Sequence, residues 1–225
     1  MKRTSPAVMK VVSPEEVLPG LHALRPEPLP FAPRLHIRAF HLQRDRGNLL
    51  IYSAPSLESD AETIRELGGA SRHYLNHWHE AMFMPETVFA PVFVHDQDSA
   101  RASERTQVDS TFSDHHLVGD DFEAIPIPGH TSGATAYLWD SGRHRVLFTG
   151  DTIVLDEGTW FAAVLDSSDR TRYIESLGLI RELDFDVLVP WAASAGHPFY
   201  AATDARDAGR RIDAILERLR KGEDH

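Results

Sequence analysis

Histidine is the residue type whose placement points to chemistry, since the 225-residue chain has 13 histidines and no cysteine. Histidine is the commonest metal ligand in proteins and titrates near neutral pH. His77 and His79 flank Trp78. On an extended segment, residues two apart point to the same side, so two imidazoles at a strand end could bind one ion. The alternative is that both are polar loop residues, because so short a motif also occurs by chance.

Two further segments place a potential ligand at the end of an apolar strand. His130 lies in Pro-Gly-His-Thr-Ser-Gly, where the flanking glycines let the backbone bend and present the ring to a cleft. Asp151 lies in Phe-Thr-Gly-Asp-Thr, and the alternative for it is a carboxylate that caps the next turn. Together with His77 and His79, these residues suggest a metal site assembled at three strand ends.

Strands and helices alternate along the chain, as the apolar patterns predict. Ser59 and Glu62 predict a capping box at the start of one helix, and Gly68 and Gly69 predict its end. A hairpin is expected around Ser141-Gly142. We expect strands over 35–42, 48–53, 72–76, 91–95, 122–128, 134–140, 145–148 and 186–189, and helices over 61–67, 98–105, 169–183 and from about Thr203, the last with Ile212, Ile215, Leu216 and Leu219 on one face.

The chain is expected to form a single domain over residues 1–225. No linker rich in glycine, serine or proline divides it, and the proline-rich stretch 25–33 lies too close to the amino terminus to separate two domains. No internal repeat is evident.

Composition limits the classes of partner. The net charge is −11 and no basic stripe runs along the chain, so nucleic acid is not expected as a partner. Without cysteine there is no thiol nucleophile, disulfide or cysteine-bound zinc. Residues 1–17 lack the apolar run of a signal peptide, and no stretch is long enough to span a membrane. A cytoplasmic protein with a small-molecule substrate and no membrane partner is therefore expected, and oligomeric state stays open.

The order of the three motifs, His-x-His, then Pro-Gly-His-Thr-Ser-Gly, then Thr-Gly-Asp-Thr, resembles the metallo-β-lactamase superfamily. The resemblance covers roughly residues 48–190, and Asn48–Pro55 is similar to the early strand of that family, which usually ends in an acidic turn. It implies a mixed α/β (α+β) fold, the four-layer αββα metallo-β-lactamase-like sandwich.

The sequence departs from the family pattern at the residues that hold a second metal. The family motif continues His-x-His-x-Asp-His, and here the last two positions are Ala81 and Met82. The family also supplies a late histidine after a Pro-Gly turn, where this chain has Trp191 and Ala192 after Pro190. The resemblance therefore implies an incomplete, degenerate site.

The half of the site that remains implies one metal ion. By resemblance, His77, His79 and His130 bind it, and Asp151 is a fourth ligand or orients the bound water. Three imidazoles and a water are also usual for catalytic zinc. Zinc is the first choice, with iron or manganese as alternatives, because imidazole is not selective.

Other residues could replace the missing ligands or line the pocket. Glu80 is out of register with His79, whereas His197 could approach from its loop. His95, His115 and His116 are expected to be solvated or structural. Aromatic residues near the motifs could line an apolar pocket or pack in the core: Trp78, Trp160, Phe161 and Trp191.

Three functions remain open. The first is a metal-dependent hydrolase of an ester, thioester or lactone-like bond, in which the metal lowers the pKa of its attacking water to about 7 and Asp151 holds that water or takes its proton. The second is a catalytically degenerate protein that binds a ligand or partner. The third is a serine hydrolase, since Ala192–Gly196 loosely resembles a nucleophile elbow around Ser194, although little chain follows for its acid and histidine.

Overall fold

The computed structural model describes residues 14–223. Most of the segment assessed for a signal peptide, residues 1–13, lies outside the described residues, as do 224–225 at the other end of the expected domain. Within the described part of the chain, no helix combines the length and apolar character needed to cross a bilayer.

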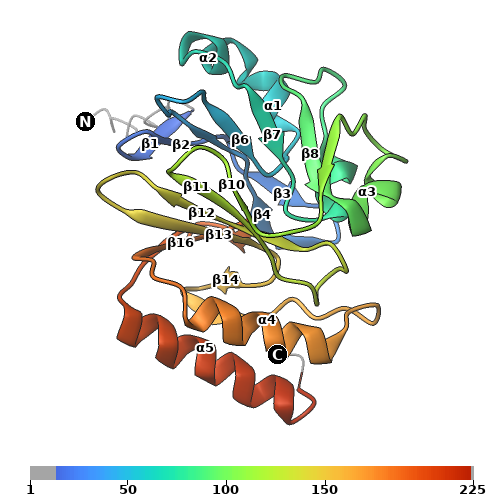
Figure 1. The fold of residues 1–225 in the computed structure, drawn as a ribbon, viewed down its shortest axis with the longest axis vertical. Helices are drawn as coiled ribbons and strands as arrows, with labels where there is room; N and C mark the ends of the chain where they lie inside the picture. The colour runs from blue at the N-terminus through green and yellow to red at the C-terminus, as the bar shows by residue number, and fades with distance from the viewer. Residues whose placement is uncertain (1–13, 224–225) are drawn as a thin grey trace, which may run out of the picture.

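The elements stack as helices, sheet, sheet and helices (Figure 1). Short helices lie on the outer side of the first sheet, and two long carboxy-terminal helices cover the second. The helices are α1 (Ser56–Ser59), α2 (Ala61–Glu66), the 3₁₀ helix η1 (Trp78–Phe83), α3 (Asp96–Ala102), α4 (Arg170–Arg181) and α5 (Ala205–Arg220).

The first sheet is antiparallel from β1 to β6 and parallel from β6 to β9. Its parallel part carries the segment that leads to His77. In spatial order its strands are β1 (Glu15–Leu18), β2 (Leu21–Ala23), β5 (Phe40–Leu42), β6 (Leu49–Ile51), β7 (Arg72–Tyr74), β8 (Val92–His95) and β9 (Ser110–Phe112).

The second sheet contains the expected hairpin, in which Asp140 pairs with Arg145 across the turn at Ser141-Gly142. A parallel pairing then joins β13 to β16. In spatial order the strands are β10 (His116–Leu117), β11 (Phe122–Pro126), β12 (Thr135–Asp140), β13 (Arg145–Gly150), β16 (Val187–Pro190) and β18 (Ala201–Ala202).

A third sheet lies beside the candidate site. Two of its strands, β14 and β17, closely follow β13 and β16 along the chain. In spatial order the strands are β15 (Thr159–Phe161), β14 (Val154–Asp156), β17 (Ala192–Ser194), β4 (Ala32–Ile37) and β3 (Glu27–Leu29).

The single strand predicted over 35–42 is wrong, because the chain changes sheets there. His36 pairs with Ala193 in the third sheet, whereas His41 pairs with Leu50 in the first. Arg38 lies between them and donates its backbone N–H to the carbonyl of Trp191. The backbone of each half therefore forms its hydrogen bonds with a different sheet. The alternation of apolar and polar residues along the sequence does not show such a change of sheet.

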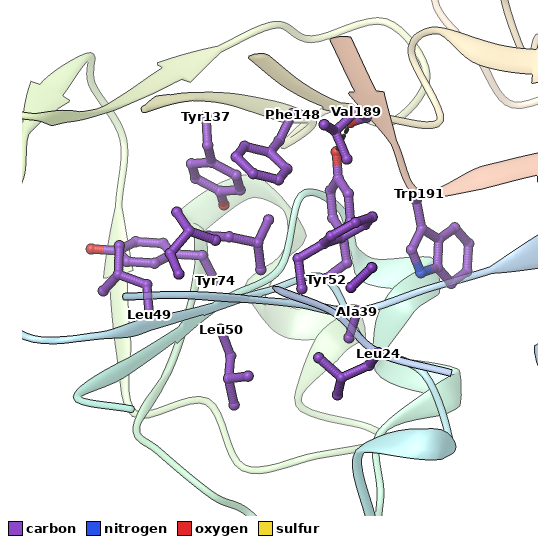
Figure 2. Close-up of a cluster of buried hydrophobic side chains, with 14 of the residues drawn as sticks. Leu24, Ala39, Leu49, Leu50, Tyr52, Tyr74, Tyr137, Phe148, Val189 and Trp191 are labelled. Carbon is purple, nitrogen blue, oxygen red and sulfur yellow. Dashed lines mark hydrogen bonds between the residues drawn. The ribbon is translucent and has the colours of Figure 1, made fainter. Parts of the chain in front are cut away.

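Large aromatic side chains fill the core between the first two sheets (Figure 2). Tyr137 and Phe148 come from the second sheet and meet Tyr74 and Tyr52 from the first. The ring centroids of Tyr74 and Tyr137 are 5.2 Å apart, and those of Tyr52 and Phe148 5.9 Å. The Tyr52 hydroxyl donates to the carbonyl of Val189 at 2.8 Å, so this polar group is satisfied although fully buried.

A second core lies between the second sheet and helices α4 and α5. The expected apolar face of the last helix is confirmed, because its four predicted residues are all buried there. Asp204 caps α5 by accepting the backbone N–H of Asp207 at 2.8 Å, and Asp169 caps α4 in the same way from Arg172 at 3.0 Å.

The predicted capping box is wrong, although the glycine stop is confirmed. Ser59 ends α1, and α2 begins after Asp60, whose side chain makes no cap hydrogen bond. That carboxylate is buried and forms an ion pair with Arg25 at 2.8 Å instead. A tertiary contact thus overrides the local cap. Gly68 and Gly69 both have positive φ after α2, which favours glycine.

Helix α3 begins two residues earlier than predicted, at Asp96 rather than Asp98. His95 caps it, because its Nδ1 accepts the backbone N–H of Gln97 at 3.2 Å. Asp98 is therefore the third residue of the helix rather than the first, and its side chain is buried beside the candidate site.

Candidate metal centre

His77 and His79 lie where an extended segment changes into a 3₁₀ helix. Strand β7 ends at Tyr74, His77 is still extended with φ −156° and ψ 165°, and η1 begins at Trp78. The expectation that both rings lie on one extended segment is therefore wrong. The turn nevertheless brings the rings together, with centroids 4.9 Å apart and an interplanar angle of 84°.

Asp98 joins the start of η1 to the loop that carries His130. Its carboxylate accepts the backbone N–H of Trp78 at 3.0 Å, that of Gly133 at 2.9 Å and the hydroxyl of Thr131 at 2.6 Å. A Cβ at Gly133 would lie 2.7–2.8 Å from Asp98, so only glycine lets the loop approach this closely. Asp98 therefore fixes the two histidine-bearing segments relative to each other.

The Asp151 loop is fixed by two tyrosines. The backbone N–H of Gly150 donates to the Tyr52 hydroxyl at 2.8 Å. The Tyr173 hydroxyl has two carbonyl acceptors in the loop, that of Thr152 at 2.9 Å and that of Asp151 at 3.1 Å. Gly150 has φ +56°, and a Cβ there would lie 1.9 Å from Oδ1 of Asn76. Glycine is thus required for Asp151 to lie against the His77 segment.

The structure brings all four predicted ligands together. One ligand atom from each of His77, His79, His130 and Asp151 lies within 4.8 Å of the others. Asp151 Oδ2 is 3.5 Å from Nε2 of His77 and 3.7 Å from Nε2 of His130, and Nδ1 of His79 is 3.1 Å from Nε2 of His130. Imidazole nitrogens and a carboxylate at this spacing are the donor set of a zinc-type site.

Neighbouring acceptors determine which histidine nitrogens face the cluster. His130 Nδ1 is 2.6 Å from the carbonyl of Ala163, which can only accept, so this nitrogen carries the hydrogen and Nε2 keeps its lone pair. His77 Nδ1 lies 3.0 Å from Oδ1 of Asn76 and 3.1 Å from Oε1 of Glu80, which likewise leaves Nε2 as the lone pair. Such partners orient metal-binding histidines.

Two buried atoms of the cluster have no hydrogen-bond partner, namely Nε2 of His77 and Oδ1 of Asp151. Unpaired buried polar atoms are costly, so two of them on neighbouring residues of the cluster indicate that a bound group completes the site. A cation also suits the approach of His79 Nδ1 to His130 Nε2, because it accommodates a lone pair from each ring. The residues present therefore fit a metal ion.

Burial keeps the three imidazoles neutral. Desolvation lowers the pKa of His77 and of His79 to about 3, and that of His130 to about 4. Burial raises the pKa of Asp151, opposed by the neighbouring histidines. At neutral pH the histidines therefore present unprotonated nitrogens, the form that binds metals.

Glu80 is buried and faces away from the cluster. Its Oε1 accepts the backbone N–H of Asn76 at 3.1 Å and the ring N–H of His77. Burial raises its pKa well above the usual value. It is thus a positioning residue for His77 and lies outside the group of potential ligands.

The four other histidines considered from the sequence lie away from the cluster. His197 is exposed in the turn after β17 and does not supply the late histidine. His95 caps α3, and His115 lies exposed 3.0 Å from Glu123. His116 Nδ1 hydrogen-bonds the carbonyl of Asp114 at 2.9 Å. Their positions agree with solvated or structural roles.

Ser194 has none of the partners of a catalytic serine. Its hydroxyl donates to Asp156 and accepts the backbone N–H of Glu157 at 3.1 Å, whereas no histidine within residues 14–223 hydrogen-bonds it. It lies on β17 in the third sheet, not on a strand-to-helix turn. The structure therefore gives the serine-hydrolase hypothesis no support.

A cavity of about 460 Å³ opens beside the cluster. His79, His130 and Asp151 form its polar end, and the rest of its wall is mostly apolar. Trp78, Phe161 and Trp191 line it, as the sequence suggested, whereas Trp160 is buried in the second core.

Sequence reasoning missed the residues that hold the ligands in place. Asp98 and Tyr173 lie in α3 and α4, Tyr52 and Asn76 lie in the loops after β6 and β7, and none stands in a recognisable motif. Only the glycines gave a usable signal, because Gly133 and Gly150 flank the motif residues and are required by close contacts.

Comparison with known proteins agrees with this arrangement. A family model described as "Metallo-beta-lactamase superfamily" matches residues 59–192. No curated protein sequence matches the chain.

Solved structures of similar fold also exist. A metallo-beta-lactamase family protein from Thermus thermophilus is 19% identical with a TM-score of 0.63, covering 91% of this chain and 80% of that one. A metallo-beta-lactamase from Pontibacter korlensis is 16% identical with a TM-score of 0.64, covering 89% and 94%. The metallo-beta-lactamase GOB-18 from Elizabethkingia meningoseptica is 17% identical with a TM-score of 0.57, covering 87% and 91%. At these identities the likeness shows the fold alone, and the expected four-layer sandwich is confirmed.

Proposed function

Because the chain belongs to the metallo-beta-lactamase superfamily, we propose that it is a mononuclear metal-dependent hydrolase of an ester, thioester or lactone-like bond. Membership supports metal-dependent hydrolysis at the level of the superfamily. The observation that carries the proposal for this chain is the group His77, His79, His130 and Asp151, whose ligand atoms lie within 4.8 Å of one another beside an open cavity.

The proposed metal ligands are Nε2 of His77, Nδ1 of His79, Nε2 of His130 and the carboxylate of Asp151. Zinc is the first choice, and iron or manganese are alternatives, because imidazole and carboxylate accept all three. When bound, such an ion polarises a substrate carbonyl and makes water more acidic.

The chain's own residues orient the site and handle the proton. Glu80 and Asn76 hold the ring of His77, and the carbonyl of Ala163 holds that of His130. Asp151 Oδ1, which has no other partner, is the proposed proton acceptor for attacking water. Water adds across the acyl bond, which breaks to give a carboxylic acid and an alcohol or thiol.

A single ion is proposed because the positions for a second one are apolar. Ala81 is buried in a small core with Leu75 and Val92, and Met82 lines the cavity. His197 is exposed and Glu80 faces away from the cluster. Neither residue supports a rebuilt second site.

The competing proposal is a catalytically degenerate protein that keeps the fold and binds a ligand. The apolar residues at Ala81 and Met82 favour it, since they remove two polar groups from the site. Under both proposals the ligand is a small molecule, which suits the size of the cavity.

Metal content tests the proposal first. The protein is purified without chelator, and metal per chain is measured by inductively coupled plasma mass spectrometry. The His77→Ala/His130→Ala variant is measured beside it, with His197→Ala as a control because His197 is exposed away from the cluster. About one zinc or iron per chain, lost only in the double variant, is expected.

Two ions per chain would overturn the mononuclear assignment. Absence of metal after zinc is offered would overturn the hydrolase and favour the ligand-binding protein. A second measurement separates catalysis from metal binding alone. Turnover of a panel of esters, thioesters and lactones is expected in the parent protein and should be abolished in Asp151→Asn, although that variant retains its metal.

A further inference from the structure

Exposed apolar side chains concentrate at the mouth of the cavity. Phe31 is 74% exposed, Met82 41% and Leu165 42%, and all three line it. Only three other large apolar side chains among residues 14–223 are exposed in this way. Scattered exposed apolar residues need no explanation, but a group around a concave site marks a binding surface.

The wall behind this mouth offers almost no charge. Outside the polar end formed by His79, His130 and Asp151, Arg34 is the only charged residue among the described residues that line the cavity. Arg34 forms an ion pair with Asp156, so its charge already has a partner. The remaining described lining residues are all apolar, among them Phe31, Trp78, Met82, Leu165 and Trp191.

Positions that differ from the family motif form part of this wall. Met82 lines the cavity where the motif has a ligand for a second metal, and Trp191 and Ala192 line it where the late histidine is expected. The Trp191 ring is fixed, because its Nε1 donates to the carbonyl of Ser53 at 2.8 Å. Its centroid lies 5.4 Å from that of His77, so the apolar wall directly adjoins the proposed metal ligands.

From this placement we infer that the cavity binds an uncharged apolar acyl group, aliphatic or aromatic, with its carbonyl at the His79–His130–Asp151 end. The inference rests on the proposed function for the position of the carbonyl, but the apolar wall is independent of catalysis. A charged tail would find no free counter-charge among the described lining residues and would lose its hydration. An apolar tail instead gains from burial against Phe31, Met82 and Leu165.

Equilibrium binding of methyl ketones tests the inference without any chemical step. These probes carry a carbonyl and an uncharged tail, and no bond in them can be hydrolysed. Butanone, hexanone, octanone and decanone are titrated into the zinc-loaded protein while tryptophan fluorescence is followed, since Trp78 and Trp191 line the cavity. Affinity should rise about fourfold per added methylene until the cavity is filled. Equal affinity along the series would overturn the inference.

Two exposed leucines provide a matched pair of variants. Leu165→Asp places a charge at the mouth, whereas Leu179→Asp places it on α4, outside the cavity, at a residue of similar exposure, 42% against 44%. We expect Leu165→Asp to weaken octanone binding about tenfold or more, and Leu179→Asp to leave it within about twofold. Equal effects of the two variants would count against the cavity as the binding site. 7-Oxooctanoate, the methyl ketone of the same length with a carboxylate at the far end of its tail, should bind more weakly than octanone.

Nitrophenyl esters of the same chain lengths separate this inference from the proposed function. If ketone affinity depends on chain length but no ester is turned over, the apolar binding site is supported and the hydrolase is contradicted. The opposite result is equal kcat/KM for acetyl and octanoyl esters together with ketone affinity that does not depend on chain length. It would support the hydrolase and contradict the apolar binding site. A parallel rise of kcat/KM and of ketone affinity supports both.

Discussion

Two adjoining parts of the site differ in how their side chains are held. In the polar half, formed by His77, His79, His130 and Asp151, fixed backbone or side-chain partners surround the ligands. In the apolar half, formed by Ala81, Met82 and Trp191, packing predominates, and only the Trp191 ring has a hydrogen bond. Preorganised polar groups suit an ion, whereas an apolar wall suits a hydrocarbon tail.

The contrast lies in what holds each half in place. The polar half does not depend on residues 81 and 82, because Asp98, Asn76 and Tyr52 hold its loops through separate contacts. In the apolar half, Met82 and Trp191 line the cavity, whereas Ala81 is buried in the small core with Leu75 and Val92.

Removing Asp98 is the most damaging single change expected in the polar half. Asp98→Ala leaves the buried N–H groups of Trp78 and Gly133 without an acceptor, which we expect to destabilise the protein by about 3–5 kcal/mol. Urea unfolding of the metal-free protein measures this. Asp96→Ala, in the same turn but 43% exposed at its side chain, should cost less than about 1 kcal/mol. Similar values for both variants would contradict the assigned role of Asp98.

Removing Glu80 should weaken metal binding more than it weakens the fold. Glu80→Ala frees the His77 ring to turn, and loss of such an orienting partner typically lowers metal affinity about 10–100-fold. Competition with a chromogenic zinc chelator measures the change. Glu80→Gln, which keeps an oxygen acceptor for His77, should fall between the parent and the alanine variant. Glu86→Ala, at an exposed glutamate, is the control. An unchanged zinc affinity in Glu80→Ala would contradict the role of Glu80 as a positioning residue.

Acidification should destabilise the metal-free protein through the same histidines. Burial lowers the pKa of His77 in the folded protein to about 3, from the ordinary value of 6.5. Between about pH 3 and pH 6.5, His77 is therefore protonated in the unfolded chain but neutral in the folded protein. Stability is therefore fully present above about pH 6.5 and declines as pH falls toward 3, with about 2 kcal/mol lost at pH 5 through His77 alone. Thermal unfolding from pH 7 to pH 5 measures this.

Zinc should lower further the pH at which the histidines of the folded protein become protonated, since protons and metal compete for the same nitrogens. His73, also buried with a pKa lowered to about 4, contributes to the same trend. The His77→Ala variant should therefore retain part of the pH dependence but show a shallower slope. An identical slope in that variant would contradict a neutral, buried His77.

The smallest effect is expected from returning one polar ligand to the apolar half. In Met82→His, the neighbouring positions Ala81 and Trp191 still offer no ligand. We expect metal content to stay at about one ion per chain, because a single imidazole cannot hold a second ion. Octanone binding should weaken modestly, by about threefold, as one apolar contact is lost. A second ion in this variant would show that the apolar half still keeps a latent site.

Much of the fold could be predicted because its signals are local. The hairpin at Ser141-Gly142 follows from two apolar runs joined by a turn dipeptide, and α5 follows from a helical stripe of four apolar residues. The third sheet was missed except within the run over 35–42, because its strands are short and one shares that run with β5. In a strand of three residues, alternation cannot be told from chance.

The four candidate ligands were found from sequence because each has a distinctive neighbourhood. His130 and Asp151 stand beside glycines, and His77 and His79 stand two residues apart. Their supporting residues could not be found, since Asp98 acts on Trp78 and Gly133 across 20 and 35 residues of chain. The sequence around an aspartate in a helix does not indicate with which distant backbone N–H groups its side chain will form hydrogen bonds.

The sequence by itself determined which side chains could bind a metal, where glycine must permit close approach, and that Ala81 and Met82 cannot act as the usual second set of ligands. Only the tertiary structure decided which histidine nitrogens face one another and that Phe31, Met82 and Leu165 share one cavity. The reason is physical: residue type and local turns are written along the chain, whereas lone-pair direction and cavity shape depend on packing between segments far apart in sequence.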